Sequence, residues 1–358
     1  MHHLPEQLVP LQGQPVLVTD ATGLLGSNLV KLLAARGARV RGLVRSPEKA
    51  KRFLTDVAFE PVVGDMQNVA GFAPALEDCV AVFHTAAYFR EYYQPGSHDG
   101  PLDAINVRGT LELMRAADSS RVARFVNTSS SGTIGHKPDG SPGDEDTPPS
   151  KRQLQNGYFR SKVEGDKLIH AFQPASGMRV IEIMPGWMWG PGDAAPTGAG
   201  QLVLDFVKRK LPVVPEGGTN IVDPRDVAAA MIEAAQRGAH GARYIVAGEY
   251  RSIEQMLGVL EKQTGIPAPR LHLPHAFVMA FAYFEELRAK LTKRPLLVSR
   301  EAITLMRAKP TVSSARAQRE LGASFRPITD TVNDTLAWYQ KHGFIEQSRP
   351  AVAAGAIG

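Results

Sequence analysis

The sequence predicts an α/β protein, with a doubly wound parallel sheet and a smaller carboxyl-terminal substrate-binding lobe. Short apolar, β-rich runs alternate with stretches of helical apolar spacing through the first half of the chain. This alternation is typical of parallel strands joined by right-handed crossovers. A turn with two glycines follows the first run, and beyond Pro185 the alternation loosens as proline and glycine cluster between residues 190 and 218. We therefore expect the sheet first and the lobe after it.

Six apolar runs are predicted as strands because glycine, proline or polar residues bound them. In parallel sheets ligands bind outside the carboxyl ends of the strands, so the candidate site residues are sought there. The predicted strands are 16–19, 40–44, 59–63, 81–84, 124–128 and 179–184, and the clearest predicted helices are 24–35, 111–117 and 158–171.

Composition excludes several classes of protein. Of the 358 residues 43% are hydrophobic and 22% charged, with a net charge of +5, so neither disorder nor nucleic-acid binding is expected. The single cysteine, Cys79, forbids an internal disulfide or a cysteine metal cluster. The start of the chain has no apolar signal segment, and the apolar stretch 276–284 is too short to span a bilayer, so it is interpreted as a buried or lid helix. We expect a cytoplasmic protein that does not bind a membrane.

The turn after the first strand has the features of a dinucleotide-binding turn in a Rossmann-type sheet. Gly23 and Gly26 lie where the helix begins, which lets backbone amides approach a pyrophosphate. The alternative is a strand-to-helix turn without a ligand. The residues expected to contact the cofactor here are Thr19, Thr22, Gly23, Leu24, Leu25 and Gly26.

The end of the second strand favours NADP (NADPH) over NAD. It ends in Val44-Arg45-Ser46, without the acid that binds a free ribose hydroxyl. Arg45 offers a planar fork for a 2′-phosphate, and Ser46 offers a further donor. The alternative is that Arg45 only caps a surface strand. Further cofactor contacts are expected from Asp65 and Met66, and from the small residues Thr85, Ala86 and Ala87, although turn chemistry and close packing explain these residues equally well.

A catalytic group is predicted on the helix 158–171. Tyr158 and Lys162 are four residues apart, so both project from one helix face. A lysine beside a tyrosine favours phenolate, which makes the phenol usable as an acid or base near neutral pH. Ser130 ends the fifth strand and can donate a hydrogen bond to a carbonyl oxygen. A solvated helix face is the alternative for the Tyr-Lys pair alone.

These motifs, in their order, resemble a known family. The glycine turn, Asn106-Val107-Arg108-Gly109-Thr110, the serine run and Tyr158-Phe159-Arg160-Ser161-Lys162 are followed by Pro185-Gly186-Trp187-Met188-Trp189-Gly190 and Ile221-Val222-Asp223-Pro224-Arg225-Asp226. The chain from about Pro15 to Gly343 thus resembles an extended short-chain dehydrogenase/reductase (SDR), in the dihydroflavonol-4-reductase-like branch of the epimerase/dehydratase superfamily.

The resemblance implies hydride transfer between a nicotinamide and a carbonyl or alcohol carbon, with Tyr158 as general acid. Lys162 corresponds to the residue that lowers the pKa of the tyrosine and binds the nicotinamide ribose, and Ser130 to the residue that orients the carbonyl. Asn106 matches the helix asparagine that supports a water relay; the alternative is a side chain that only binds backbone. Pro185 and Met188 match the segment that holds the carboxamide, and residues 223–226 match a mostly structural stretch. Dimers through the helices around Leu111 and Tyr158 are expected by analogy.

The chain departs from the family at two positions. Asp20 replaces the first glycine of the turn, which costs about 1 kcal/mol if a positive φ is required and places a negative charge near the pyrophosphate unless Asp20 turns to cap the helix. Met184 stands where many nucleotide-sugar epimerases carry arginine, which argues against a sugar nucleotide. An apolar or aromatic substrate pocket is expected instead from Tyr88, Phe89, Ser131, Trp187 and Trp189. The loop 136–150 either closes over the substrate or is a surface excursion.

The favoured function is NADPH-dependent reduction of an aldehyde or ketone with an apolar or aromatic body. Two alternatives remain: a dinucleotide-fold binding or regulatory protein inactivated through Asp20, and an NAD-dependent epimerase or hydroxysteroid-type dehydrogenase. The predicted organisation is an amino-terminal extension over 1–14, a dinucleotide-binding Rossmann domain over 15–185 with strand contributions from later segments, a substrate-binding lobe mainly over 186–345, and a flexible tail over 346–358.

Overall fold

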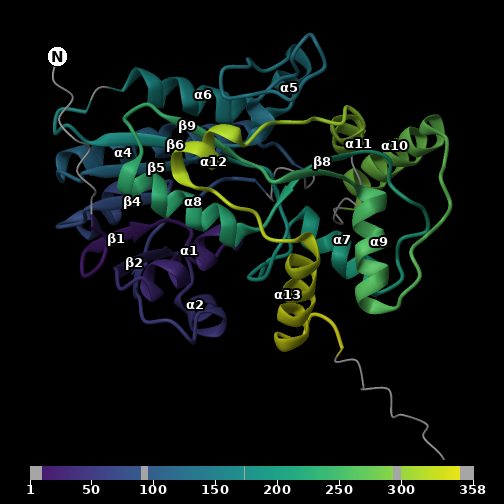
Figure 1. Ribbon diagram of the computed structural model, residues 1–358, viewed down its shortest axis with the longest axis horizontal. Coiled ribbons are helices and arrows are strands. Elements are labelled where there is room, and N and C mark those ends of the chain that lie inside the picture. Colours follow the sequence, from purple (N-terminus) through teal and green to yellow (C-terminus); the bar gives the residue numbers. More distant parts are fainter. Residues whose placement is uncertain (1–9, 90–95, 173, 293–299, 347–358) are drawn as a thin grey trace, which may run out of the picture.

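A computed structural model describes residues 10–89, 96–172, 174–292 and 300–346 (Figure 1). The predicted tail from 347 onward and the first nine residues of the predicted extension lie outside these residues. The large sheet has seven parallel strands in the order β3-β2-β1-β4-β5-β6-β9, which confirms the doubly wound α/β fold. Its strands are β1 (Pro15–Val18), β2 (Arg39–Val44), β3 (Glu60–Val63), β4 (Ala81–His84), β5 (Arg124–Thr128), β6 (Arg179–Pro185) and β9 (Arg243–Val246).

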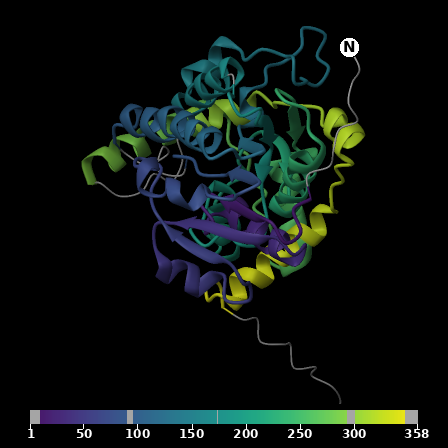
Figure 2. The ribbon, with the colours of Figure 1, turned by 90° about the vertical axis from the view of Figure 1, so that its left-hand side faces the viewer.

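Helices cover both faces of the large sheet (Figure 2). One face packs against α1 (Leu24–Ala35), α8 (Pro224–Arg237) and α12 (Ala315–Leu321). The other packs against α4 (Thr110–Ser119) and α6 (Gly157–Ala171), with the short turns 69–71 and 73–76. Successive side chains of a strand point to opposite faces, so neighbouring residues of one strand serve different cores: Val16 and Val18 lie in the first, and Leu17 lies in the second.

The lobe is built around a second, three-stranded sheet in the order β10-β8-β7. Three segments numbered within 186–345, namely α8, β9 and α12, pack on the large sheet instead. The lobe consists of β7 (Trp187–Met188), β8 (Gly218–Val222), β10 (Glu249–Ser252), α7 (Gly198–Val207), α9 (Ile253–Thr264), α10 (His275–Thr292), α11 (Arg300–Arg307) and α13 (Ile328–Lys341). Short helices α2 (Pro47–Phe53), α3 (Asp99–Leu102) and α5 (Lys151–Gln155) and a π-helix, η4 (Asp103–Gly109), complete the described elements.

Ion pairs join the lobe to the large sheet's helices. Asp223 accepts from the backbone N–H of Arg225 at the start of α8, and the Arg225 guanidinium binds both Asp223 and Asp334 of α13. Asp226 forms an ion pair with Arg326 just before α13. This stretch is therefore structural, as its resemblance implied.

The loop between β5 and α5 is anchored at several points. Gly143 pairs with Val312 in a parallel bridge, and the Glu145 carboxylate accepts a hydrogen bond from the backbone N–H of Ile245 at 2.9 Å. The Arg243 guanidinium donates to the Glu145 carbonyl oxygen at 2.8 Å. The expected loop 136–150 is thus tied to β9 and to residue 312, so the structure favours the surface excursion over a closing lid.

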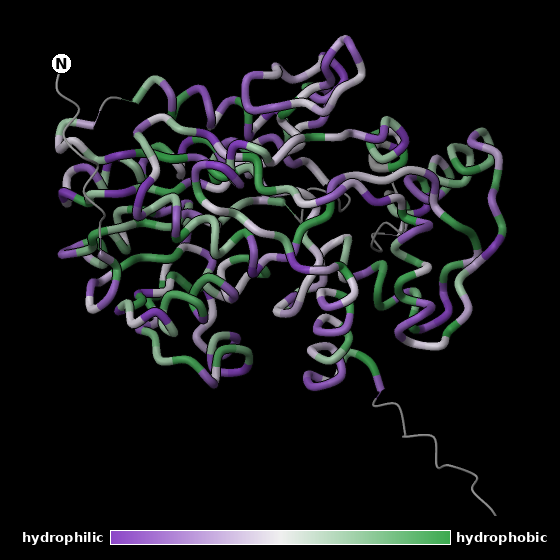
Figure 3. Tube along the Cα trace, in the orientation of Figure 1, coloured by the Kyte–Doolittle hydropathy of each residue, from purple (hydrophilic) through white to green (hydrophobic). Residues whose placement is uncertain are grey.

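The stretch 276–284 forms part of α10, but it is not the buried helix that its apolar composition indicated. Phe277, Phe281 and Phe284 are 66%, 52% and 65% exposed, respectively. The hydropathy of the chain (Figure 3) shows apolar segments along the large sheet and also in this outer helix. Within the residues that the structure describes, no helix has both the length and the apolar character needed to cross a bilayer.

Candidate active site

The predicted Tyr-Lys pair lies on the buried face of α6. Asn156 caps this helix by accepting a hydrogen bond from the Phe159 N–H at 2.8 Å, which places Tyr158 in the first turn. Tyr158 and Lys162 are 7% and 5% exposed, and Lys162 Nζ is 6.0 Å from the centre of the Tyr158 ring. Lys162 Nζ donates to the Thr128 carbonyl oxygen at 2.8 Å. The pair is therefore held against the carboxyl end of β5, where the sequence placed the site.

The charge of Lys162 is set by its surroundings. Burial lowers the pKa of Lys162 to about 8, while the carboxyl groups of Asp166 and Glu182 oppose this change. A pKa near 8 leaves the ammonium form dominant at neutral pH. A cation next to a phenol stabilises the phenolate, so the arrangement suits a tyrosine that gives up its proton.

Ser130 stands at the end of β5 with a defined orientation. Its Oγ accepts a hydrogen bond from the Gly132 N–H at 3.1 Å, which leaves the hydroxyl hydrogen as a donor. Gly132 packs against the ring of Phe159 on α6: an added Cβ would lie 2.1 Å from that ring. A glycine is thus required for the serine turn to approach the catalytic helix. Ser131 follows at the start of a short 3₁₀ turn and is half-buried.

Asn106 binds protein groups on every side. Its Nδ2 donates to Ser161 Oγ at 3.0 Å and to the Tyr88 carbonyl oxygen at 3.2 Å, and its Oδ1 accepts from the Tyr88 N–H at 2.7 Å. Both amide hydrogens are therefore used. Asn106 ties the segment after β4 to α6 through backbone and side-chain partners, and its part in a water relay stays a prediction.

Aromatic side chains surround the pair unequally. The Phe89 ring packs on the Tyr158 ring with centroids 4.8 Å apart, and Tyr88 Oη is 2.8 Å from His98 Nδ1. Trp187 is half-buried and meets Trp189 edge-on at 5.3 Å. Trp189 itself is 2% exposed and packs in the core of the lobe. The expectation that Trp189 lines an open pocket is therefore corrected: it is a packing residue.

Thr19, directly after β1, joins this strand to the end of β4 by hydrogen bonds. Its hydroxyl accepts from the N–H groups of Thr85 and Ala86 at 3.0 Å each and lies 2.9 Å from His84 Nδ1. The residue is fully buried, so its side chain is a structural link between the segments that end β1 and β4, and its contact with a cofactor stays a prediction. Burial lowers the pKa of His84 to about 3, which keeps this core histidine neutral.

The glycine turn is compact because Gly23 and Gly26 have no side chains. A Cβ at Gly26 would lie 2.1 Å from the Asp20 carbonyl oxygen, and a Cβ at Gly23 would lie 2.1 Å from Asp20 Oδ2. Asp20 adopts φ 49°, the left-handed conformation that glycine adopts without strain. The N-cap residue of α1 is Gly23, which has no capping side chain, and the Asp20 carboxylate lies beside it. The amino end of α1 therefore carries a negative charge of the protein itself.

The end of β2 presents one exposed cation. Arg45 is exposed, whereas Ser46 is the cap residue of α2 and accepts from the Lys49 N–H at 3.2 Å. The Ser46 hydroxyl also donates to the Glu48 carboxylate at 2.8 Å. Arg52 lies over the Phe53 ring at 5.0 Å. Arg52 is exposed as well, so both guanidinium groups are open to solvent, and the contact of Arg45 with a 2′-phosphate stays a prediction.

The remaining predicted cofactor residues gather at neighbouring strand ends. Asp65 accepts from the Gln67 N–H at 2.9 Å, which is the turn chemistry considered as its alternative. Met66 is buried beside the close approach of Gly109. Thr22, Leu24 and Leu25 start α1, Ala87 follows β4, Pro185 ends β6, and Met188 lies in β7.

Three charged residues near the pair were not predicted: the buried Asp166 and Glu182 and the half-buried Arg243. Asp166 lies one turn beyond Lys162 on the same helix face, which spacing alone could have indicated. Glu182 interrupts the apolar run of β6, and an acid inside a buried strand is such a signal too. Arg243 on β9 reaches them only through the fold.

Comparison with known proteins assigns the family. The profile of the NAD dependent epimerase/dehydratase family matches residues 16–247. The chain belongs to this family. It is similar to a Synechocystis protein with the provisional name dihydroflavonol 4-reductase, at 32% identity over 92% of this chain and 95% of that protein, and to Sterol demethylase protein B of Methylococcus capsulatus, at 33% identity over 92% and 99%. The crystal structure of gox2253 superposes with a TM-score of 0.78 at 31% identity, over 93% of this chain and all of that one.

Membership in this family establishes an extended SDR fold and a nicotinamide-dinucleotide-dependent class of enzymes, oxidoreductases and epimerases. The resemblance that the motifs indicated is thereby confirmed. The site described above lies at the carboxyl ends of β1, β2, β4, β5 and β6, where such a sheet binds its ligand.

Proposed function

We propose that this protein is an NADPH-dependent reductase of ketones or aldehydes, with Tyr158 as general acid and substrates that have an apolar or aromatic body. The observation that carries the proposal is the buried Tyr158–Lys162 pair, anchored on the Thr128 carbonyl oxygen beside Ser130. A solvated helix face would not bury both side chains. A protein that only senses a dinucleotide has no need of this arrangement.

The residues present fit a bound nicotinamide dinucleotide. The missing side chains of Gly23 and Gly26 keep the turn narrow enough for backbone amides to hold a pyrophosphate. Arg45 would bind the 2′-phosphate, and Tyr158 and Lys162 would bind the nicotinamide ribose. When bound and reduced, the dinucleotide supplies a hydride to the carbonyl carbon.

The side chains of this site handle the proton and the developing charge. Ser130 donates its hydroxyl hydrogen to the carbonyl oxygen and so orients the substrate. Tyr158 Oη transfers its proton to the same oxygen as the alkoxide forms. The Lys162 ammonium stabilises the phenolate that remains, and Phe89 shields the tyrosine ring from water on one side.

An apolar substrate is supported by the aromatic side chains at the site and by the relatives. Phe89 packs on Tyr158, and the half-buried Trp187 lies beyond the end of β6. One relative is named after a flavonoid reductase and another after sterol demethylation, and both names refer to polycyclic, largely apolar molecules. A cytoplasmic location and a homodimer belong to the same proposal.

Asp20 favours a second candidate function, a dinucleotide-fold binding or regulatory protein without turnover. Its carboxylate lies beside Gly23, where the pyrophosphate of a cofactor would approach. At about 5 Å the repulsion between the two charges is about 1 to 3 kcal/mol, which weakens binding about five- to two-hundred-fold. Weakened binding still permits turnover, so the reductase is the preferred function.

Titration of the purified protein with NADPH and NADH, followed by nicotinamide fluorescence and tryptophan quenching, tests the proposal. Micromolar NADPH binding with much weaker NADH binding is expected, and a screen of aromatic and polycyclic carbonyl compounds then follows NADPH oxidation. Binding without turnover of any compound would favour the second candidate. Tighter binding of NADH would contradict the role of Arg45 and favour an NAD-dependent epimerase or hydroxysteroid-type dehydrogenase.

A further inference from the structure

A cluster of buried charges lies behind Lys162. On α6, Lys162 is followed one and two turns later by Asp166 and His170. Asp166 is 6% exposed, and Glu182 on β6 is 1% exposed. Arg243 on β9 places its Nε 3.3 Å from Glu182 Oε2 and its Nη2 3.8 Å from Asp166 Oδ2. Three elements thus direct ionisable groups into one small volume.

The two carboxyl groups of this cluster face the same guanidinium. Asp166 Oδ2 and Glu182 Oε2 lie 3.8 Å and 3.3 Å from nitrogens of Arg243, and burial, followed by the charge of Glu182, raises the pKa of Asp166 well above its usual value. Two ionised carboxylates have no hydrogen to share, because each only accepts. A proton on Asp166 supplies the missing donor.

The hydrogen bonding of Glu182 also indicates a proton on Asp166. Neither of its buried oxygens accepts a hydrogen bond of good geometry from the donors present, although Arg243 and His170 lie within ion-pair distance. Asp166 Oδ2, by contrast, accepts from Ser129 Oγ at 2.8 Å. A hydrogen bond donated by Asp166 would satisfy one of the two unpartnered oxygens of Glu182.

We propose that Asp166 and Glu182 share a single proton, so that the pair holds one negative charge behind Lys162 and acts as a positioning element for the Tyr158–Lys162 pair. With one charge the pair compensates the buried ammonium of Lys162, while the guanidinium of Arg243, whose side chain is 24% exposed, keeps part of its hydration. No second carboxylate then has to be ionised away from water. An effect of the pair on the rate of carbonyl reduction rests on the proposed function, whereas the presence of a shared proton does not.

Charged groups from every neighbouring element face the pair. Lys162 and His170 come from α6, with His170 Nε2 3.1 Å from Glu182 Oε2, and Arg243 comes from β9. The loop before α5 contributes Glu145, whose carboxylate is bound to the Ile245 N–H, and the exposed Asp146. Lys167 of α6 is exposed and lines the same cavity as Asp166. Three cations, a histidine and two further acids therefore accompany the two carboxyl groups.

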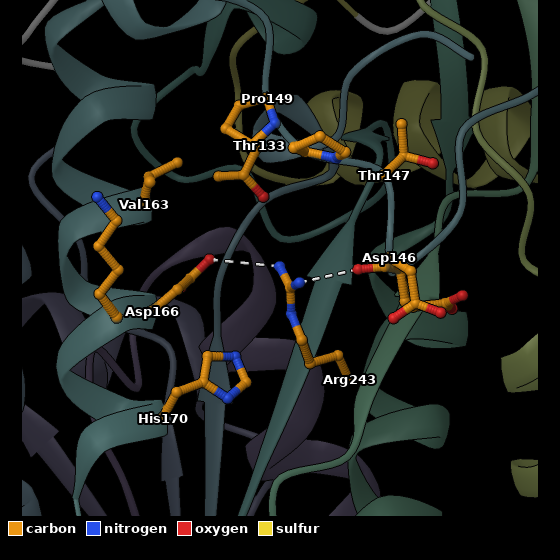
Figure 4. A pocket seen from close by; sticks show the side chains of 11 residues that line it. Thr133, Asp146, Thr147, Pro149, Val163, Asp166, His170 and Arg243 are labelled. Carbon is orange, nitrogen blue, oxygen red and sulfur yellow. Dashed lines mark hydrogen bonds and ion pairs between the residues drawn. The ribbon is translucent and has the colours of Figure 1, made fainter. Parts of the chain in front are cut away.

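A cavity of about 330 Å³ connects this cluster to solvent (Figure 4). Asp166, His170 and Arg243 project into it, opposite Thr147 and Asp146. The cavity lies along the carboxyl-terminal half of α6 and not over Tyr158. Water in it can exchange the shared proton without passing through the substrate site, so the pair can equilibrate with the pH of the medium.

Proton uptake on folding is the first test, and it uses the protein without substrate. Urea unfolding is measured from pH 5 to pH 7 for the wild type and for Asp166→Asn. Asparagine keeps an acceptor for Ser129 and a donor for Glu182, but it takes up no proton. Because folding raises the pKa of Asp166, the wild type must lose stability relative to the variant as pH rises, by up to about tenfold in the unfolding constant per pH unit.

Control variants separate an effect of the shared proton from the effect of removing any negative charge from α6. Glu164→Gln, at an exposed position of the same helix, is expected to show the same pH dependence as the wild type. Glu182→Gln removes the second carboxyl group and its charge but leaves Asp166 buried, so the proton uptake of this variant on folding must be smaller than that of the wild type. It replaces Asp166→Asn if that variant fails to fold. Parallel pH dependences of the wild type and both pair variants would show two ionised carboxylates and overturn the proposal.

The pH profile of kcat/KM is the second test. Each single variant retains one negative charge, so the alkaline limb set by Lys162 near pH 8 is expected to move by about 0.3 pH unit or less. The variant with both substitutions retains no negative charge at the pair. Its alkaline limb must move at least about one pH unit lower, because the Lys162 ammonium loses the carboxylate that compensates it. If each single substitution moved the alkaline limb of kcat/KM by the same amount, and the two shifts added up in the double variant, a shared proton would be contradicted. Absence of carbonyl reduction would overturn the proposed function but leave the unfolding test intact.

Discussion

The amino end of α1 and the inner face of α6 are both placed at strand ends, but they carry charge in different ways. At α1 the charge is a half-buried carboxylate, Asp20, held at φ 49° beside Gly23. At α6 the charge is the buried ammonium of Lys162, with Asp166 and Glu182 behind it. Solvent screens a half-buried charge, whereas a buried charge requires compensation from the fold. A single substitution can therefore change α1 locally, but α6 depends on several strands.

The largest effect is expected at α6, from Tyr158→Phe. The ring still packs on Phe89, but the general acid is lost, so kcat for carbonyl reduction should fall about 100- to 10,000-fold. NADPH affinity should fall by no more than about tenfold, the loss of one hydrogen bond to the ribose. Steady-state rates and cofactor titration measure the two quantities. Tyr250→Phe is the matched control, since it removes a hydroxyl that lies beside Gly218 in the lobe and should leave kcat within a few-fold. Turnover near the parent rate in Tyr158→Phe would remove this tyrosine from the mechanism.

The turn at α1 is tested by Asp20→Gly and Asp20→Asn. Removing the carboxylate should tighten NADPH binding about five- to two-hundred-fold, because the repulsion from the pyrophosphate disappears. Asparagine tolerates a positive φ, so it isolates the charge; glycine additionally relieves about 1 kcal/mol of backbone strain, visible in thermal unfolding. Unchanged affinity in both variants would show that Asp20 does not face the pyrophosphate, and the contrast between the two helices would lose its functional meaning.

Cofactor choice is the next effect in size. Arg45→Ala should weaken NADPH binding about 10- to 100-fold and leave NADH binding nearly unchanged, since one charge-assisted contact to phosphate is lost. Arg52→Ala is the control, because Arg52 lies over the Phe53 ring. The ratio of the two dissociation constants, measured by fluorescence titration, is the readout. An equal loss for both cofactors would assign Arg45 a general and not a selective role.

The last effect concerns stability at alkaline pH and is small at any single pH step. The folded pKa of Lys162 is about 8, against 10.5 for an ordinary lysine, so between these values the unfolded chain binds the extra proton. The contribution of Lys162 to stability therefore rises with pH from 8 to 10.5, by at most tenfold in the unfolding constant per pH unit. Denaturant unfolding of the wild type and Lys162→Met measures it. Identical pH dependences would mean that Lys162 is not the buried cation that distinguishes α6.

Much of the site could be predicted from local spacing. Tyr158 and Lys162 follow from a four-residue interval on a helix, and Gly23 and Gly26 follow from their place between a strand and a helix. The parallel sheet followed from the alternation of apolar runs with helical segments, and it was confirmed. Each of these inferences uses residues that are near each other in the chain.

Other features depended on contacts between distant segments. The hydroxyl of Thr19 is used by β4, the amide of Asn106 by Tyr88 and Ser161, and the ring of Trp189 by the core of the lobe. Spacing alone could not distinguish these uses from contacts with a ligand. A polar or aromatic side chain near a strand end binds or packs against whichever group the fold brings into contact with it.

The sequence by itself determined the alternation of strands and helices in the large sheet, the Tyr158–Lys162 pair on one helix face and the glycine turn, because backbone periodicity sets which neighbours along the chain share a face. Only the tertiary structure brought Glu182 of β6 and Arg243 of β9 to Asp166 of α6. It also decided that Asp20 lies against Gly23. The physical reason is that burial and charge compensation are properties of the volume around a group, and that volume is filled by segments far apart in the chain.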